Sequence, residues 1–258
     1  MVVARQPRLD LAGIPQHVVQ RGNDRNACFA APVDYGQHLQ ELREAATKNA
    51  CAIHAYVLMT NHVHLLATPA EPGAISRMMQ AVGRRYVGSF NARYRRTGTL
   101  WEGRFKAALV DTTRYVLACY RYVELNPVRA IMVEEPSGYP WTSYHANALG
   151  QSNPLLTPHG TYLALGENDT ARQAAYRAWV TDTFDDAEWS ELRQHTQQQR
   201  AWEATASASR WRHSPSERPP SDPAVAPGKR PRLRKNEPDP FFASKKHGCR
   251  SLPRCTTC

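Results

Sequence analysis

The order of strand and helix patterns in the first 130 residues is the feature that most constrains the fold. Strand patterns cover 14–21, 51–59, 62–68 and 104–111, and helix patterns cover 32–50, 74–96 and 114–125. The break at Thr60 and Asn61 predicts that the second and third strands form a hairpin with a tight turn. The chain therefore has the predicted order β-α-β-β-α-β-α.

This order indicates the α+β class. Its first six elements match the ferredoxin-like βαββαβ arrangement, in which helices cover one face of an antiparallel sheet. RNA-binding RRM domains share this layout. We therefore expect a ferredoxin-like (RRM-like) sandwich with an added C-terminal helix, and with the second sheet face open to a ligand. The RRM signature motif is missing from the sequence, so the fold alone does not fix the function.

The composition changes sharply towards the C-terminus. From about Thr205 onward Ser, Pro, Arg and Ala dominate, and too few apolar residues recur to bury a core. We expect a main folded domain over 1–150, a small helical extension over 151–204 and a disordered basic tail over 205–258. The basic run 229–235 in this tail could add DNA affinity that does not depend on base sequence.

The charge is positive and unevenly distributed. The chain has 33 Lys and Arg against 23 Asp and Glu, a net charge of +10. Segment 77–106 holds eight basic residues against Glu102 alone, a balance of +7, and aromatic residues alternate with them. Arg pairs with phosphates and aromatic faces stack on bases, so this segment favours nucleic-acid contact. The alternative is a solvated helix face whose aromatic residues point into the core.

The sequence shows neither the pattern of a membrane-spanning helix nor that of a secretory signal. It contains no run of about 18 apolar residues, which a membrane-spanning helix would need. The first 13 residues lack the apolar stretch of a secretory signal. We therefore expect a cytoplasmic protein with a polyanionic partner and no membrane partner.

The most specific motif is His62-Val63-His64 in the string MTNHVHLLAT. Residues i and i+2 of a strand point to the same face, so the two imidazoles leave the sheet side by side while Val63 faces the core. This arrangement can supply two metal ligands from one strand. Two histidines spaced in this way can also occur by chance on a solvated strand.

A second candidate group lies on the helix RYVLACYRYVELNPVRA, residues 114–130. Tyr122 and Asn126 are four residues apart and therefore share one helix face. A phenol and a carboxamide on one face can offer a nucleophile and a neutral oxygen ligand. Taken singly, each tyrosine of this helix could equally be a packing aromatic.

These features together resemble a known family. The element order, the His-hydrophobic-His strand and the later Tyr-bearing helix are similar to the HUH single-tyrosine transposases of small insertion sequences. The strings MTNHVHLL, GTLWEGRFKAALVD and YRYVELNPVRA resemble more narrowly the REP-associated tyrosine transposases of bacteria. The resemblance covers about residues 10–150 and extends more loosely to 200.

The resemblance assigns roles to particular residues. His62 and His64 match the metal-binding HUH pair, Tyr122 matches the nucleophile and Asn126 matches the third, helix-borne metal ligand. Tyr120 is the alternative nucleophile. It precedes Tyr122 by two positions, roughly 200° around the helix, and so faces away from Asn126.

The resemblance also implies the reaction. We expect Mg²⁺- or Mn²⁺-dependent cleavage and strand transfer of single-stranded DNA at REP-like palindromic hairpins, through a 5′-phosphotyrosine intermediate. The expected partners are DNA hairpins near the bacterial nucleoid, and the protein is expected to be a monomer or a homodimer. The candidate DNA contacts are Arg21, Arg25, Arg84, Arg85, Arg104 and Lys106.

Two other functions remain possible from the residues. The chain could be a domesticated protein that binds hairpins without cleaving them, or a metal-dependent phosphohydrolase acting on small molecules. The presence of every candidate catalytic residue favours the enzyme over the domesticated protein, and the basic, aromatic helix argues against the phosphohydrolase. From Glu203 onward the sequence departs from the family pattern, which would fit a frameshifted or divergent tail and leaves the activity of the full chain in question.

Overall fold

The computed structural model describes residues 11–110 and 113–181, without the side chains of Thr113 and Arg114. The predicted basic tail and the last part of the predicted helical extension lie outside these residues. Everything described below belongs to one compact unit of the chain.

A four-stranded antiparallel sheet lies at the centre of this unit. Its strands are β1 (Gln16–Arg21), β2 (Cys51–Met59), β3 (His62–Pro69) and β4 (Lys106–Leu109), in the spatial order β2-β3-β1-β4. Met59 pairs with His62, so the predicted tight hairpin forms. The ferredoxin-like βαββαβ order gives this sheet, and the predicted α+β class is confirmed.

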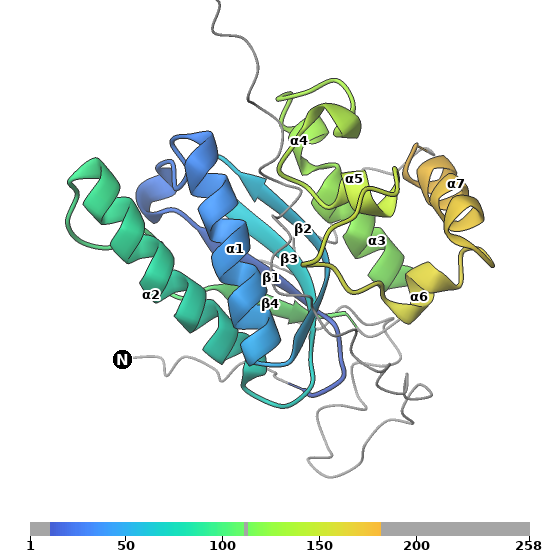
Figure 1. Cartoon of the computed structure of the whole chain (residues 1–258), viewed down its shortest axis with the longest axis horizontal. Helices are drawn as coiled ribbons and strands as arrows, with labels where there is room; N and C mark the ends of the chain where they lie inside the picture. Colours follow the sequence, from blue (N-terminus) through green and yellow to red (C-terminus); the bar gives the residue numbers. More distant parts are fainter. Residues whose placement is uncertain (1–10, 111–112, 182–258) are drawn as a thin grey trace, which may run out of the picture. The chain divides into compact units, whose positions relative to one another are not determined.

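Helices α1 (Pro32–Lys48) and α2 (Ala74–Tyr94) cover one face of the sheet, as Figure 1 shows. Both helices end within two residues of the predicted bounds. Their apolar sides pack against Val18, Leu58 and Leu65 from the sheet. The buried Asp34 connects the two helices, because its carboxylate accepts hydrogen bonds from the Ala30 and Ala31 amides and pairs with Arg93 of α2.

The other face of the sheet is not open, which corrects the prediction. Helix α3 (Thr113–Glu124) packs on it, followed by α5 (Tyr144–Asn147), α6 (Gly160–Leu163) and α7 (Asp169–Thr181) on the same side in Figure 1. The reason is a second core of aromatic residues that the C-terminal segments bring to α3, namely Tyr139, Tyr144, Tyr162 and Tyr176. The last two belong to the predicted 151–204 extension, so this extension shares the core of the main domain.

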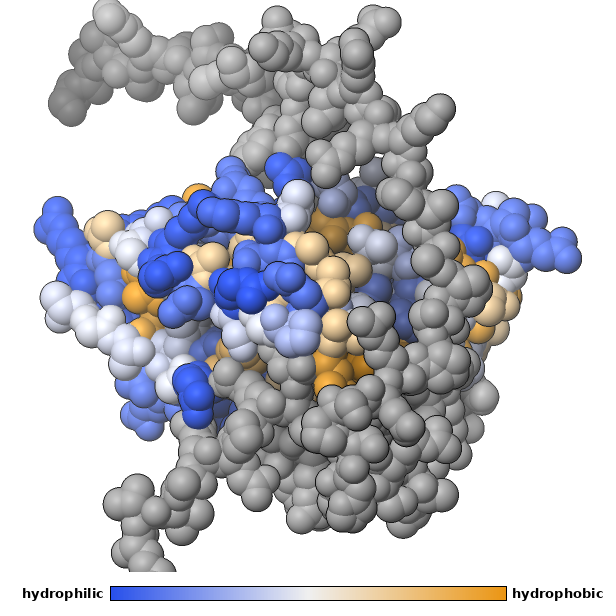
Figure 2. Space-filling model, turned by 90° about the horizontal axis from the view of Figure 1, so that it is seen from below, coloured by the Kyte–Doolittle hydropathy of each residue, from blue (hydrophilic) through white to orange (hydrophobic). Residues whose placement is uncertain are grey.

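Short helices complete the described chain. They are η1 (Asn23–Arg25), α4 (Asn126–Arg129) and η2 (Pro136–Gly138). Where the described residues are visible in Figure 2, the surface is mostly hydrophilic with small apolar areas between. None of the described helices combines the length and the apolarity that crossing a bilayer requires.

Candidate active site

The predicted histidine pair lies on the α3 side of the sheet. His62 and His64 point to the same face of β3, with their ring centroids 4.9 Å apart, while Val63 between them is buried in the core beneath α1 and α2. His64 is 5% exposed and His62 is partly exposed. The alternation of the strand therefore orients the two imidazoles as the sequence predicts.

Tyr122 lies next to this pair. Helix α3 crosses the sheet so that the Tyr122 ring contacts the His64 ring edge to face, with centroids 5.6 Å apart. The side chain is 6% exposed. Tyr122 lies at least 58 residues after the two histidines in the sequence, and the fold brings its phenol next to their imidazoles.

Tyr120 points elsewhere, as its position on the helix predicts. It is fully buried in the second core, where it stacks on Tyr162 and its hydroxyl accepts a hydrogen bond from the His159 amide at 3.2 Å. These contacts account for Tyr120 as a packing residue.

Asn126 does not continue the regular helix of Tyr122. Helix α3 ends at Glu124, and Asn126 begins the short helix α4, with Pro127 as the next residue. The Asn126 side chain nevertheless stays beside the nucleophile candidate, because its Nδ2 donates to the Tyr122 carbonyl at 2.7 Å. This bond leaves the Asn126 Oδ1 as the atom that can act as a metal ligand.

His17 is a member of the site that sequence reasoning missed. It lies on β1, is fully buried, and its Nε2 is 2.9 Å from the Nδ1 of His64. Its ring stacks on His64 with centroids 5.1 Å apart and contacts Tyr122 edge to face at 5.4 Å. The β1–β3 register, in which His17 lies opposite Leu66, places it on the histidine face, and this register is not readable from the sequence.

The histidines of the site are neutral near pH 7. Burial lowers the pKa of His17 to about 3, and burial followed by repulsion from Arg21 lowers the pKa of His62 to about 4. Burial also holds the pKa of His64 well below its usual value, with smaller contributions from His62, His17 and Arg21. A neutral imidazole has a free electron pair on one nitrogen, as a metal ligand needs.

The hydrogen bonds determine which nitrogen carries this electron pair. The Asn61 Nδ2 donates to the Arg25 carbonyl, so the Asn61 Oδ1 is the atom that accepts from the His62 Nδ1 at 2.7 Å. The Nε2 of His62 is then unprotonated. Metal-binding histidines usually donate their other N–H group in this way. The donor set of two imidazoles and one amide oxygen therefore fits a divalent metal.

No group of three or more His, Cys, Asp or Glu side chains among the described residues is arranged to hold a metal. An Asn ligand falls outside such a group, and the candidate site depends on the Asn126 oxygen as its third ligand.

The candidate DNA contacts fall into two sets. Arg21 of β1 lies opposite His62 of β3. Lys106 is the first residue of β4, and its side chain is on the same face of the strand as the buried Ala108. These two residues flank the histidines. Arg84 and Arg85 lie on α2, across the sheet from them. Arg25 lies in η1, and Arg104 lies in the segment that leads into β4.

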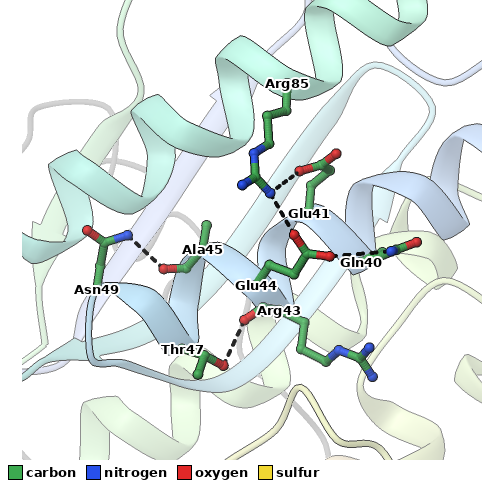
Figure 3. Close-up of polar contacts among 8 residues, drawn as sticks. All are labelled: Gln40, Glu41, Arg43, Glu44, Ala45, Thr47, Asn49 and Arg85. Atoms are coloured by element: carbon green, nitrogen blue, oxygen red, sulfur yellow. Dashed lines mark hydrogen bonds and ion pairs between the residues drawn. The ribbon is translucent and has the colours of Figure 1, made fainter.

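Arg85 is already engaged within the protein. Its guanidinium reaches Glu41 at 2.9 Å and Glu44 at 2.6 Å, both on α1 (Figure 3). These two carboxylates compete with phosphate for Arg85, whereas Arg84 is exposed on the neighbouring position of α2.

Comparison with known proteins gives one family match and two similar structures. The protein family described as "Transposase IS200 like" matches residues 11–126, which include both histidines, Tyr122 and Asn126. This segment of the chain, 116 of the 258 residues, is similar to that family. The members of that family are enzymes of DNA transposition that cleave single-stranded DNA and generally use a divalent metal.

Two solved structures are similar to this chain. One is a REP-associated tyrosine transposase bound to a REP hairpin, with 17% sequence identity, a TM-score of 0.49, and coverage of 62% of this chain and 93% of that one. The other is a putative transposase from Deinococcus radiodurans R1, with 22% identity, a TM-score of 0.33, and coverage of 45% and 92%. No curated protein matches the sequence.

Proposed function

We propose that this chain cleaves and rejoins single-stranded DNA at REP-like hairpins, with Tyr122 as the nucleophile. The observation that carries the proposal is the contact of the Tyr122 ring with His64 and His17, beside His62. A tyrosine next to neutral imidazoles, at the end of the sheet where Arg21 and Lys106 lie, suits phosphodiester chemistry.

The reaction forms one bond and breaks one. The Tyr122 oxygen attacks phosphorus, the bond from phosphorus to the 3′ oxygen breaks, and the products are a 5′-phosphotyrosine and a free 3′-hydroxyl. The tyrosine proton is lost and the leaving oxygen gains one, so no net proton is consumed. Attack by another 3′-hydroxyl reverses the step and rejoins DNA without an external energy source.

The residues of the site divide this work. His62, His64 and the Asn126 oxygen would hold Mg²⁺ or Mn²⁺, and the bound metal would supply Lewis-acid polarisation of a non-bridging phosphate oxygen. Imidazole ligands favour Mn²⁺ over Mg²⁺, and the amide oxygen suits either. Arg21 and Lys106 flank the histidines and would bind the flanking phosphates. His17 holds the His64 ring in place through its hydrogen bond and stacking contact.

A labelled-DNA assay tests the proposal. The full chain is incubated with a single-stranded REP hairpin that carries a label at its 3′ end, with Mn²⁺, with Mg²⁺ or with EDTA. We expect a labelled covalent adduct on a denaturing gel with either metal and none with EDTA. A strand of equal composition that cannot form a hairpin should give little adduct.

The position of the label provides the control for the polarity of cleavage. DNA labelled at its 5′ end should give free labelled DNA and no labelled protein, because the 5′-phosphotyrosine keeps only the downstream fragment. Labelled protein from the 5′-labelled strand would contradict the proposed intermediate. Hairpin binding without an adduct in either metal would support the non-cleaving binder instead.

A further inference from the structure

A cavity of about 370 Å³ lies on the opposite side of the sheet from the histidine pair. It lies between α1, α2, the end of β1 and the segment that leads into β4. Its size is within the range of small-ligand pockets. The mechanism proposed above uses none of the residues that line this cavity, although Arg104 is a candidate DNA contact.

The wall of this cavity contains a buried polar group with no partner. His38 of α1 is 2% exposed, and its Nδ1 makes no hydrogen bond within the described part of the chain. A buried polar atom without a partner destabilises the fold. Burial lowers the pKa of His38 to about 3, so the neutral ring offers one donor and one acceptor.

Further polar and aromatic groups surround His38. Gln20 is 8% exposed and donates through its Nε2 to the Gly103 carbonyl at 3.3 Å, which leaves its amide oxygen as an acceptor. Gln80 adds a second amide to the lining. Trp101 and Phe105 are both 8% exposed and supply flat apolar walls. Amides and an imidazole can pair with a base edge, and aromatic side chains can stack on a base.

The surroundings of the cavity favour a ligand attached to phosphates. Arg104 and Arg77 line it, and Arg77 is also paired with Glu71. Both arginines belong to the segment 77–106, whose residues carry a net charge of +7. Gln20 faces the cavity, and the next residue, Arg21, pairs with His62 on the opposite face. The cavity and the histidine pair therefore lie on the two faces of the sheet at the same end of β1.

We propose that this cavity binds one unpaired nucleobase of the single-stranded DNA substrate. A base within a duplex cannot enter such a cavity, because its edge is paired and its faces are stacked. The proposal rests on single-stranded DNA as the substrate in the proposed function, and it adds a base-reading site that is separate from Tyr122. Its polar wall would make binding depend on which base is present.

Gly83 provides a variant that fills the cavity without disturbing the fold. It lies on α2 at the cavity, and a Cβ at this position would meet only the Trp101 Nε1, at an ordinary contact distance of 3.9 Å. Replacing a helical Gly with Leu also favours the helix. Gly88, in the same helix, is exposed and has no atom within 4 Å of its Cβ position. Gly88→Leu is therefore the matched control.

The test compares labelled dT12, dA12 and dC12 with a 12-mer of abasic sites, using fluorescence anisotropy. All four probes carry the same phosphates, so the ratio of the abasic Kd to the Kd of the preferred base reports base recognition. We expect a ratio of about ten or more for wild type and for Gly88→Leu. In Gly83→Leu the ratio should fall at least threefold, and the difference among the three bases should shrink with it.

Thermal unfolding of both glycine variants checks that they fold. If Gly83→Leu does not fold, Gln80→Leu replaces it, because Gln80 is exposed and also lines the cavity. A Gly83→Leu ratio equal to that of wild type would overturn the proposal, as would equal binding of the abasic and base-bearing probes by wild type. Both readouts are equilibrium binding, so they are independent of the adduct assay. If the Kd ratio falls in Gly83→Leu while wild type forms no covalent adduct, the cavity binds a base but the protein does not cleave DNA as proposed.

Discussion

Tyr122→Phe is expected to abolish the covalent DNA adduct, while Tyr120→Phe leaves it in place. The Tyr122 ring lies against His64 and His17, and its hydroxyl is the only atom that the substitution removes. Without this oxygen no phosphotyrosine can form, so the adduct should fall to background at any metal concentration. Hairpin affinity should change little, because the ring and its contacts remain.

Tyr120→Phe is the matched control, since it removes a hydroxyl from the same helix two residues away. The Tyr120 hydroxyl accepts from the His159 amide in the second core, so its loss should cost about 1 kcal/mol of folding stability. Urea unfolding measures this cost and the 3′-label assay measures the adduct. An adduct that survives Tyr122→Phe and disappears in Tyr120→Phe would identify the other tyrosine as the nucleophile.

The fold could be predicted because local sequence patterns, and the order in which they occur, determine its strands and helices. The period-two alternation across His62, Val63 and His64 fixes which side chains share a face, and the short break at Thr60 fixes the hairpin. The position of Tyr120 relative to Tyr122 follows from helix geometry alone. These relations involve neighbours in sequence, and no tertiary contact is needed to predict them.

The features that were missed depend on contacts between distant segments. His17 joins the site only because β1 pairs with β3 in one particular register. Arg85 pairs with Glu41 and Glu44, which lie more than 40 residues away on another helix. The covered sheet face has the same origin, since Tyr144 and Tyr176 come from segments that carry no strong pattern of their own.

Glu124 connects the nucleophile helix to this C-terminal layer. It is fully buried two residues after Tyr122 and accepts hydrogen bonds from Ser143 at 2.5 Å, Asn147 at 2.7 Å and Tyr176 at 2.7 Å. Burial raises its pKa to about 7, although the bonds from Ser143, Tyr176 and Asn147 act in the opposite direction. The carboxyl group is therefore half protonated near neutral pH.

This raised pKa predicts how stability depends on pH. An unfolded Glu titrates near 4.5, so between about pH 4.5 and 7 the folded protein holds a proton that the unfolded chain has lost. The stabilising contribution is complete below pH 4.5 and is lost as the pH rises through 7. It amounts to about 2–3 kcal/mol between pH 5 and pH 8.

Glu124→Gln should remove this dependence. The buried histidines act in the opposite direction, because their lowered pKa values stabilise the folded state above about pH 6.5. They remain in the variant, so the difference between wild type and variant isolates Glu124. From urea unfolding at pH 5 and pH 8, we expect the variant to gain about 2–3 kcal/mol relative to wild type as the pH rises.

The exposed Glu135→Gln is the matched control and should keep the wild-type pH profile. Parallel profiles for wild type and Glu124→Gln would show that Glu124 is ionised throughout, held by its three donors against the cost of burial. Glu124 is bonded to Ser143 at the N-terminal cap of α5, to Asn147 in α5 and to Tyr176 in α7. Because these bonds hold α3 against both helices, the variant should also alter the position of α3. A lower rate of adduct formation at unchanged hairpin affinity would follow, since Tyr122 lies on the same helix.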